Sequence, residues 1–590
     1  MAELRNPLYL LPALLILIPI NIYVAGDWPG TGIQWALFRV QVTPGGESLI
    51  SFTQEIHMVL TGLITGTTGL AFVLWTAAVL LLLGYFIVTI WAMLTEKEAV
   101  LRRNALILPA CGALFLISDL VHFGIFLSGP EGLCIPAGIP LFFLFGIRGY
   151  SYGFSMKGKT LSVHEKESQG ILDCPASRLR SWFELNANRE ILSLIIISII
   201  VKTIVFFSGL LPNLPLHVIL GDTKLYYWYA TSLTWGQVPY SSYYVPYPQF
   251  FFIPLLIALI PALIIQNYPV YLYSFSGLMV IVDTATLLLV YSIAGKLWGQ
   301  SKAFLCGLLY ATAFSAAFFV PIYYDAVPSF LLILSLWMFL YRSEMAGYLL
   351  ATAGVLTKWF PFFALPYYLL HGLKTGRRWK DFTRPILYCS IMVILTIVPF
   401  ILLNTGEFLR TYTVHIGRMP EVNSSIYYLD TLCSFLFNAN PFHSFSFLLV
   451  IVAELALLSW YFRRLDSGAY ALIGCIFLSI FVFVFFNRVF STNYIIWLTP
   501  FLALLLCRTP RHILLFYLIQ LVMYLETPVL FGIVYAPFNA GYDAVTRYDV
   551  LVGSLPTVSF LFYTIKFAIL VLVFWVIARD LRKDAASPES

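Results

Sequence analysis

The chain has 590 residues, of which 60% are hydrophobic, 17% aromatic and 11% charged. So few charges cannot coat a soluble globule, and many apolar runs approach the thickness of a bilayer, which indicates a polytopic integral membrane protein. The net charge of +6 is modest and falls in short loops, so it reports membrane topology and gives no indication of nucleic-acid binding.

Residues 1–152 form a first module with four expected membrane helices. These helices lie at about residues 7–24, 68–94, 105–127 and 133–150. Arg5 is the only basic residue before the first apolar run, and no clear cleavage site follows the run. A retained helix is therefore favoured over the alternative of a cleaved signal peptide. Residues 153–189 are polar and basic, and we expect them to form a cytoplasmic linker between two domains.

Residues 190–590 form a second module of about 12 expected helices. These lie near residues 190–211, 269–294, 302–320, 324–341, 345–358, 360–373, 384–403, 446–463, 468–487, 489–507, 511–532 and 557–579. We therefore expect an all-α fold, a polytopic transmembrane helical bundle in which the larger module follows a module of about four helices.

Basic residues set the expected orientation of the helices. We expect the linker to be cytoplasmic, and the positive-inside rule then places the other Lys and Arg clusters on the cytoplasmic side as well. All of these clusters lie on that side only if residues 250–268 do not cross the membrane. That segment is barely of bilayer length and contains Pro254 and Pro261, so we expect it to lie in the interface or to re-enter, the alternative being a full span. The opposite, outer side then receives Asp222, the loop 236–248, Asp325, Lys358, the loop 404–445 and Arg488.

The expected outer side contains two acidic candidates. Asp222 lies in GDTKLYYWYA, shortly before the proline- and tyrosine-rich run GQVPYSSYYVPYPQFF at 236–251. A lone carboxylate beside such a membrane-surface segment is suited to deprotonating a hydroxyl at the level of the lipid headgroups. Asp325 lies in PIYYDAVPS at the start of a helix. Each residue has the alternative interpretation of a helix N-cap, a position that Asp favours, and for Asp222 both interpretations can hold.

Two basic candidates lie at helix ends on the same side. Lys358, in LTKWFPFF, follows one apolar run and precedes another, where it is placed to hold a lipid phosphate or, alternatively, to snorkel to the interface. Arg488, in FNRVFSTNYIIWLTP, departs from the cytoplasmic clustering of the other arginines. Its cost near hydrocarbon, about 2.5 to 3.5 kcal/mol at the centre of a helix, indicates an anionic partner.

The loop 404–445 adds further polar candidates. Arg410 and Arg418, together with His415, form a basic group for which a solvated surface is the alternative interpretation. The same loop contains Asn423 in an Asn-Ser-Ser glycosylation sequon, which is usable only if the loop is external.

The eight cysteines are scattered, mostly in apolar segments. They form no C-x-x-C motif, and no histidine has a spacing suited to zinc. We therefore expect neither a structural metal nor a required disulfide.

Several segments, taken in order, resemble the polytopic glycosyltransferases of the GT-C fold. The segments are GDTKLYYWYATSLTWGQVPY, YPQFFFIPL, DAVP, TKWFP and FNRVFSTNYIIWLTPFLALL. Within that group the chain is most similar to the polyprenyl-phosphate-mannose-dependent transferases, such as the first mannosyltransferase of GPI-anchor assembly and the bacterial phosphatidylinositol-mannoside mannosyltransferases. The resemblance spans roughly residues 190–580, rests on the shared order of moderate motifs, and leaves residues 1–152 without a counterpart.

The resemblance implies a GT-C-like second module and Asp222 as the catalytic acidic residue of the first outer loop. The eukaryotic mannosyltransferase has a D-x-D motif there, whereas this chain has Gly221-Asp222-Thr223-Lys224. A divalent metal therefore remains an alternative that the sequence does not indicate, and we expect no cofactor. The implied location is the plasma membrane of a prokaryote or the endoplasmic reticulum of a eukaryote, with an extracytoplasmic or lumenal active site.

The implied partners are a polyprenyl-phosphate sugar donor, a lipid or glycan acceptor and the surrounding membrane lipids, without nucleic acid. Asp222 is then the general base, a role often worth a factor of about 10² to 10⁴ in rate, and a single displacement inverts the anomeric centre. The donor phosphate is expected to bind Lys358, Arg488, Arg410 and Arg418. The residues expected to bind substrate are Tyr240, Tyr243, Tyr244, Tyr247, Asp325, Asn493 and Tyr494.

Two other functions remain open. A lipid or oligosaccharide flippase or transporter has no covalent chemistry, and such proteins usually show internal repeats and ionisable residues at the bilayer midplane. The sequence shows no internal repeat by eye, and its candidates lie at helix ends. An oligosaccharide polymerase or ligase shares the architecture and differs in its donor. The absence of a Gly-rich phosphate loop argues against a nucleotide-sugar donor.

Overall fold

The computed structural model describes most of the chain. The described residues are 12, 15, 19–25, 30–43, 46–94, 98–129, 132–155, 186–210, 220–265, 268–534 and 557–586. Most of the expected linker at 153–189 and most of the expected first helix lie outside these residues. The chain divides into two compact units, Met1–His217 and Val218–Ser590.

The first unit contains helices and a small sheet. Its described helices are α1 (Phe52–Leu60), α2 (Gly66–Leu94), α3 (Glu98–Asn104), α4 (Ile107–Phe123), α5 (Ile139–Ser155) and α7 (Asn186–Leu210). The rings of Trp75 on α2 and Phe115 on α4 meet edge to face at 4.5 Å, and Phe142 on α5 packs against Phe115 at 5.3 Å. These buried aromatic contacts hold the three helices together.

The sheet of the first unit was not expected from the sequence. Six antiparallel strands follow the order β4-β3-β2-β1-β6-β5. They are β1 (Asn21–Ala25), β2 (Gly30–Gln34), β3 (Phe38–Thr43), β4 (Gly46–Ser51), β5 (Ser128–Gly129) and β6 (Gly132–Ile135). The expected helices at 7–24 and 133–150 were therefore wrong where they reach into β1 and β6. Ile22 pairs with Ile33 and Ile135 across the sheet, and this cross-strand apolar packing outweighs the apolar run that suggested a helix.

The regular elements in the described part of the second unit are helices. Its elements are α8 (Gly221–Thr234), η3 (Gln249–Phe251), α9 (Phe252–Ile265), α10 (Tyr268–Trp298), α11 (Gln300–Ala311), α12 (Phe314–Phe319), α13 (Ala326–Tyr341), α14 (Glu344–Val355), η4 (Phe360–Phe363), α15 (Ala364–Lys374), η5 (Trp379–Phe382), α16 (Thr383–Leu403), α17 (Thr405–Gly417), α18 (Ser425–Phe437), α19 (Phe442–Arg464), α20 (Ala469–Phe486), η6 (Thr492–Tyr494), α21 (Ile495–Leu505), α22 (Pro510–Tyr524), η7 (Leu525–Val529), α23 (Phe531–Val534) and α25 (Thr557–Ala586).

Seven described segments are long and apolar enough to cross a membrane. They are Gly66–Thr89, Tyr268–Trp298, Trp379–Leu403, Phe442–Arg464, Ala469–Phe486, Pro510–Val529 and Val558–Asp584. In the third of these, which contains α16, the most apolar window has no buried residue. An apolar helix of that length is stable only if lipid covers its surface. The chain is therefore an integral membrane protein with a polytopic helical fold, as expected.

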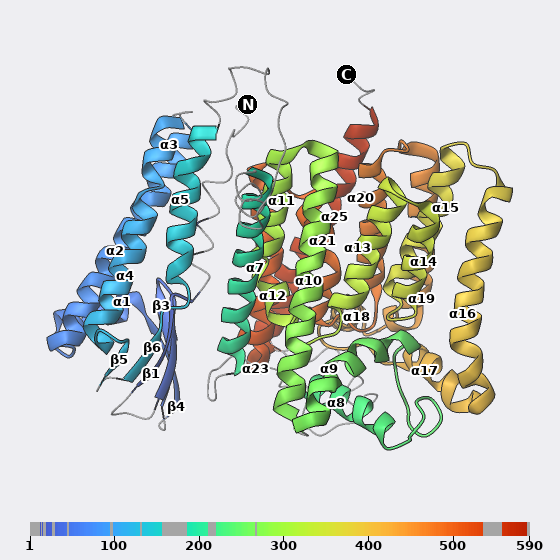
Figure 1. Cartoon of the computed structure of the whole chain (residues 1–590), viewed down its shortest axis with the longest axis horizontal. Coiled ribbons are helices and arrows are strands. Elements are labelled where there is room, and N and C mark those ends of the chain that lie inside the picture. Colours follow the sequence, from blue (N-terminus) through green and yellow to red (C-terminus); the bar gives the residue numbers. More distant parts are fainter. Residues whose placement is uncertain are drawn as a thin grey trace, which may run out of the picture. The chain divides into compact units, whose positions relative to one another are not determined.

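The structure divides some expected helices and adds others. The helix expected at 302–320 is broken at Thr312 and Ala313 into α11 and α12. Helices α8, α17 and α18 occupy segments that were expected to be loops. Segment 250–268 belongs to three elements: η3 ends at Phe251, α9 follows it and ends at Ile265, and α10 begins at Tyr268. Helix α9 lies beside α8 at one end of the unit, an arrangement that supports the interfacial interpretation (Figure 1).

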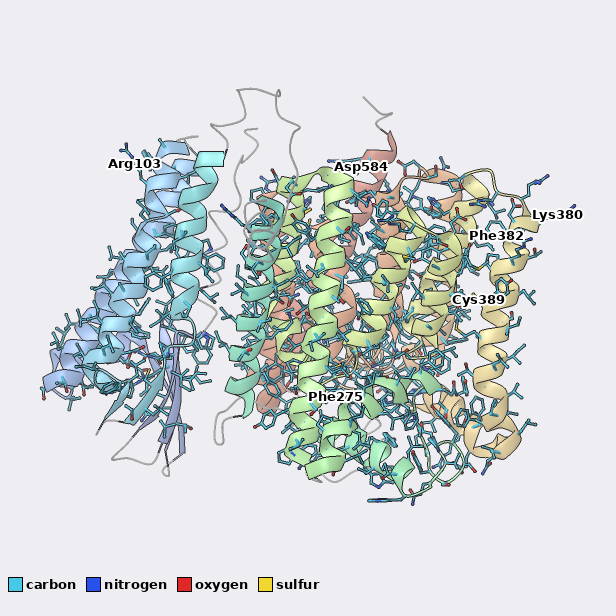
Figure 2. All side chains as sticks on the ribbon, viewed as in Figure 1. Arg103, Phe275, Lys380, Phe382, Cys389 and Asp584 are labelled. Carbon is cyan, nitrogen blue, oxygen red and sulfur yellow. The ribbon has the colours of Figure 1, made fainter. Side chains whose placement is uncertain are left out.

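The second unit has two chemically distinct ends. Helix α8, which contains Asp222, lies at one end of the bundle (Figure 1). Figure 2 shows Lys380 and Asp584 at the opposite end. Arg508 pairs with Asp584 at this second end, where the basic clusters gather. The separation into a basic end and an Asp222 end agrees with the grouping expected from the positive-inside rule, while the cellular side of each end stays a prediction.

Candidate functional site

Asp222 lies in the first turn of α8, where the helix dipole favours a negative charge. The N-cap of this helix is Leu220, so the interpretation of Asp222 as the N-cap is wrong. The carboxylate accepts a hydrogen bond from Tyr323, in the turn that precedes α13. The side chain of Asp222 therefore faces another element of the bundle and does not cap its own helix.

Asp325 forms an ion pair with Lys358, with 2.6 Å between Oδ1 and Nζ. The carboxylate is fully buried and the lysine side chain is 12% exposed. Asp325 occupies the N-cap position of α13, but its side chain makes no capping bond. It accepts hydrogen bonds instead from Trp497 Nε1 and, at 3.3 Å, from Asn493 Nδ2. Three donors compensate this carboxylate for its removal from water.

Four aromatic rings surround the ammonium group of Lys358. Its Nζ lies 4.8 Å from the ring centre of Tyr324, 5.1 Å from Trp497, and 5.7 Å from both Tyr247 and Tyr494. Cation–π contacts of this kind are worth about 0.5 to 2 kcal/mol each, more as water is excluded. The alternative interpretation, in which Lys358 snorkels to the interface, is wrong because the side chain points into the protein.

The electrostatic surroundings of Asp222 join it to this ion pair. Burial is the largest influence and raises the pKa of the Asp222 carboxyl above its ordinary value. Lys358 lowers this pKa, Asp325 raises it, and the Tyr323 hydrogen bond and Arg418 lower it again. The net effect is upward. A carboxylate with a raised pKa is a stronger base than an ordinary aspartate.

The tyrosines of the loop 236–248 have different surroundings. Tyr240 is fully buried and donates to the backbone carbonyl of Tyr247 at 2.6 Å. Tyr243 stacks on Tyr229 of α8 and donates to its carbonyl at 3.3 Å. These two residues stabilise the loop. Among the four tyrosines predicted in this loop, Tyr247 and Tyr244 have rings that contact basic side chains, Lys358 and Arg410 respectively.

Helix α17 holds the same loop in place. Thr411 donates to the carbonyl of Val245 at 2.8 Å, and His415 Nε2 lies 3.0 Å from the carbonyl oxygen of Pro246. His415, which belonged to the expected basic group, is therefore a contact between α17 and the loop. Both bonds lie within two residues of Tyr247 along the chain. Helix α17 therefore fixes the part of the loop next to Tyr247, whose ring contacts Lys358.

Arg410 and Arg418 occupy separate environments and each pairs with an acid. Arg410 lies 5.2 Å above the ring of Tyr244 and 3.4 Å from Glu407. Arg418 pairs with Glu421 and acts electrostatically on Asp222. Arg418 therefore contributes to the electrostatic surroundings of Asp222, whereas Arg410 contacts Tyr244 of the loop.

Arg488 donates to three acceptors within the protein. Its Nε donates to Ser446 at 2.9 Å, one Nη donates to the carbonyl of Arg418 at 3.1 Å, and the other donates to the carbonyl of His443 at 2.8 Å. Its own carbonyl accepts from the amide of Glu421 at 2.8 Å. Arg488 thus ties the segment around residue 418 to α19. The binding of a donor phosphate by Arg488 stays a prediction.

The structure brings most of the predicted site residues together and adds members. Asp222, Asp325, Lys358, Tyr247, Asn493, Tyr494 and Arg418 belong to one connected group. Sequence reasoning missed Tyr323, Tyr324 and Trp497. Tyr323 and Tyr324 directly precede Asp325 in the motif PIYYDAVPS, and Trp497 follows Asn493 by four residues, so adjacency to a candidate was the signal that could have identified them.

Two sequence expectations concern other chemistry. Asn423 of the sequon is 6% exposed in the folded chain, whereas its use as a glycosylation site requires an accessible side chain. Within the described ranges, no three His, Cys, Asp or Glu side chains lie close enough to hold a metal ion.

No protein-family model matches the chain, and no curated protein matches it significantly. Its function is therefore argued from the geometry of the site.

Proposed function

We propose that this chain is an integral-membrane glycosyltransferase. It moves a hexose, with mannose as the first candidate, from a polyprenyl or dolichyl phosphate to a lipid-linked or glycan acceptor on the extracytoplasmic face, with inversion. One observation carries the proposal. Asp222 is a carboxylate with a raised pKa, bonded to Tyr323 and within electrostatic reach of Lys358 and Arg418, at the end of the bundle opposite the basic loops.

The reaction needs one base and one group that balances charge. The acceptor hydroxyl attacks the anomeric carbon, and its proton passes to Asp222 as the new glycosidic bond forms. The bond between that carbon and the phosphate oxygen breaks, and its electron pair leaves with the polyprenyl phosphate. The leaving group gains negative charge during this step, so a fixed cation nearby stabilises the transition state.

Lys358 and Arg418 are the cations whose charges act on Asp222. Lys358 is already paired with Asp325, which makes Asp325 a positioning residue that fixes the direction of the ammonium group. The rings of Tyr247 and Tyr494 border the same lysine and offer flat faces of the kind that pack against sugars. The segment Gly221-Asp222-Thr223-Lys224 does not contain the D-x-D motif of the eukaryotic mannosyltransferase, so the proposed reaction is written without a metal ion.

Transfer by the purified chain tests the proposal. The chain is reconstituted in lipid nanodiscs and supplied with radiolabelled polyprenyl-phosphate mannose, polyprenyl-phosphate glucose or a nucleotide sugar, each with a membrane lipid extract as acceptor. We expect label to move from a polyprenyl-phosphate sugar, and not from the nucleotide sugar, into a new lipid or glycan product. Transfer from the nucleotide sugar alone, or from a polyprenyl-diphosphate oligosaccharide alone, contradicts the proposed donor.

A transporter or flippase is the second candidate, and one observation favours it. Asp283 lies midway along α10, is 3% exposed, and accepts a 2.6 Å hydrogen bond from Tyr310. Ionisable residues within membrane helices commonly mark ion or substrate paths. Translocation of labelled lipid across a proteoliposome membrane, lost in Asp283→Asn and retained in Asp222→Asn, would favour this second function over group transfer.

A further inference from the structure

A buried ion pair lies outside the groups used in the proposed reaction. Lys566 on α25 and Glu526 on η7 approach to 2.7 Å between Nζ and Oε2. The side chains are 0% and 1% exposed. Both residues lie within candidate membrane spans. Removing two charges from water is costly, so a buried pair at this depth calls for a role beyond simple packing.

Lys566 also contacts a segment near the proposed site. Its Nζ donates to the backbone carbonyl of Asn423 at 3.1 Å. The same ammonium group lies 4.1 Å from the ring centre of Phe490, two residues after Arg488. The lysine therefore connects α25 and η7 to the segment 418–425, which ends at the first residue of α18. A methionine or leucine at this position would leave the Asn423 carbonyl without this donor.

The segment 418–425 is held at several further points. The amide of Glu421 donates to the carbonyl of Arg488, and Arg488 donates in turn to the carbonyl of Arg418. The amide and hydroxyl of Ser424 both bond to the carbonyl of Glu421. Arg418 pairs with Glu421 through its side chain. The position of the Arg418 guanidinium thus depends on a short, internally bonded segment.

Arg418 is the member of that segment whose charge acts on the site. Its charge acts on Asp222 and on Tyr494, which stacks on Trp497 and borders Lys358. A shift of the segment therefore changes the charge environment of the proposed base. We propose that the Lys566–Glu526 pair is a positioning device: it anchors the segment 418–425 through the Asn423 carbonyl, and so holds the backbone from which the Arg418 side chain extends.

The proposal has a consequence for the pH dependence of transfer, which rests on the proposed function. Asp222 must be ionised to act as the base, so the rate rises with pH through its pKa. The groups that interact electrostatically with Asp222 are Lys358, Arg418, Tyr323, Asp325, Tyr226, Tyr229 and Tyr247. Arg418 lowers the pKa of Asp222. A loosened segment weakens this effect, and the acid limb of the pH–rate profile then moves to higher pH.

The main test uses a variant that removes the pair without leaving a buried charge. Lys566→Met combined with Glu526→Leu replaces the ion pair by apolar groups, a change that is often neutral or stabilising. We expect a melting temperature equal to or above that of the wild type, together with an acid limb moved to higher pH. Lys566→Arg keeps a donor for the Asn423 carbonyl and should restore much of the wild-type profile. Arg418→Ala should move the acid limb in the same direction, and adding it to the double variant should produce little further movement.

Hydrogen exchange of the full chain in nanodiscs tests the anchor without any measurement of activity. We expect the amides of Glu421 and Ser424 to exchange at least about tenfold faster in the double variant, because the segment loses a hydrogen bond. Lys374→Met is the matched control, since Lys374 bonds to the carbonyls of Tyr461 and Leu465 instead. Its segment 418–425 should exchange as in the wild type.

Wild-type exchange at Glu421 and Ser424 in the double variant overturns the anchor. Faster exchange with an unmoved acid limb overturns the connection to Asp222. If the wild type transfers no sugar, the proposed function fails by itself, and the exchange measurement still decides whether Lys566 holds the segment.

Discussion

The carboxylate of Asp325 and the ammonium group of Lys358 meet at 2.6 Å, although 33 residues separate them in the sequence. One precedes α13, and the other lies between α14 and η4. Because Asp325 is fully buried and also accepts from Trp497, the pair joins three parts of the bundle at one point. The same lysine lowers the pKa of Asp222, so this junction supports the geometry and the electrostatics of the proposed base.

A double-mutant cycle on this pair should show strong coupling. Lys358→Met leaves a buried carboxylate without its cation, and breaking a buried pair in this way costs about 3 to 5 kcal/mol. Adding Asp325→Asn removes that charge and should recover part of the loss, since the amide oxygen still accepts from Trp497. Thermal unfolding in detergent measures the change for both single variants and the double variant. Additive losses would show that the two side chains do not depend on each other.

Asp222→Asn should make the folded chain more stable at neutral pH. Burial raises the pKa of Asp222 above its ordinary value of 3.8, so its ionised form is less favourable in the folded chain than in the unfolded chain. This cost is absent below the ordinary pKa and is complete above the raised one. The melting temperature of the variant should therefore exceed that of the wild type near pH 8, and the difference should disappear towards pH 4. A variant less stable than the wild type at pH 8 would mean that the ionised carboxylate stabilises the fold.

The sequence identified the charged residues of the site but not the contacts between them. Asp222, Asp325 and Lys358 were identified because each is a charged residue that interrupts an apolar or aromatic run. Their mutual contacts were not predictable, because the Asp325–Lys358 pair depends on how α13 packs against the end of α14. Trp497 was overlooked because tryptophan is common in membrane proteins, and only the structure shows its indole N–H directed at Asp325.

The sheet of the first unit was not predicted from the sequence. The apolar run before Ala25 predicted a helix, yet Asn21–Ala25 forms a strand whose partners come from Gly30–Gln34 and Gly132–Ile135. The second partner is more than 100 residues away, so no local pattern indicates the pairing. Helices such as α2 and α10 were well predicted because a continuous apolar run of bilayer length has few alternatives.

Arg488 should be sensitive even to a conservative change. Arg488→Lys keeps the charge, but an ammonium group cannot bond to Ser446 and to the carbonyls of Arg418 and His443 with the planar geometry seen here. We expect a raised Michaelis constant for the donor.

Lys358→Ala and Arg488→Ala should each weaken donor use, and together they should cost less than the sum, because both shape one charge environment. Strict additivity, or normal donor use in both, would remove Arg488 from the donor site.

Accessibility to a membrane-impermeant thiol reagent tests the orientation. In a chain whose native cysteines are replaced, a cysteine at the exposed position Ser242 should react from outside the cell or lumenally in vesicles. Cysteines at Gln300 and Gly376, which are also exposed, should react only after the membrane is permeabilised. Reaction of position 300 from the same side as position 242 would mean that residues 250–268 cross the membrane.

The turnover of Asp222→Asn tests the central claim most directly. The variant keeps the shape of the side chain and an acceptor for Tyr323, but it cannot take up the proton of an acceptor hydroxyl. Lys224→Ala, two residues further along α8 and exposed, is the matched control. With a radiolabelled polyprenyl-phosphate sugar, we expect Asp222→Asn to bind the donor normally and to lose a factor of about 10² to 10⁴ in turnover, while the control transfers sugar at the wild-type rate. Turnover of Asp222→Asn within about tenfold of the wild type would contradict the assignment of Asp222 as the general base.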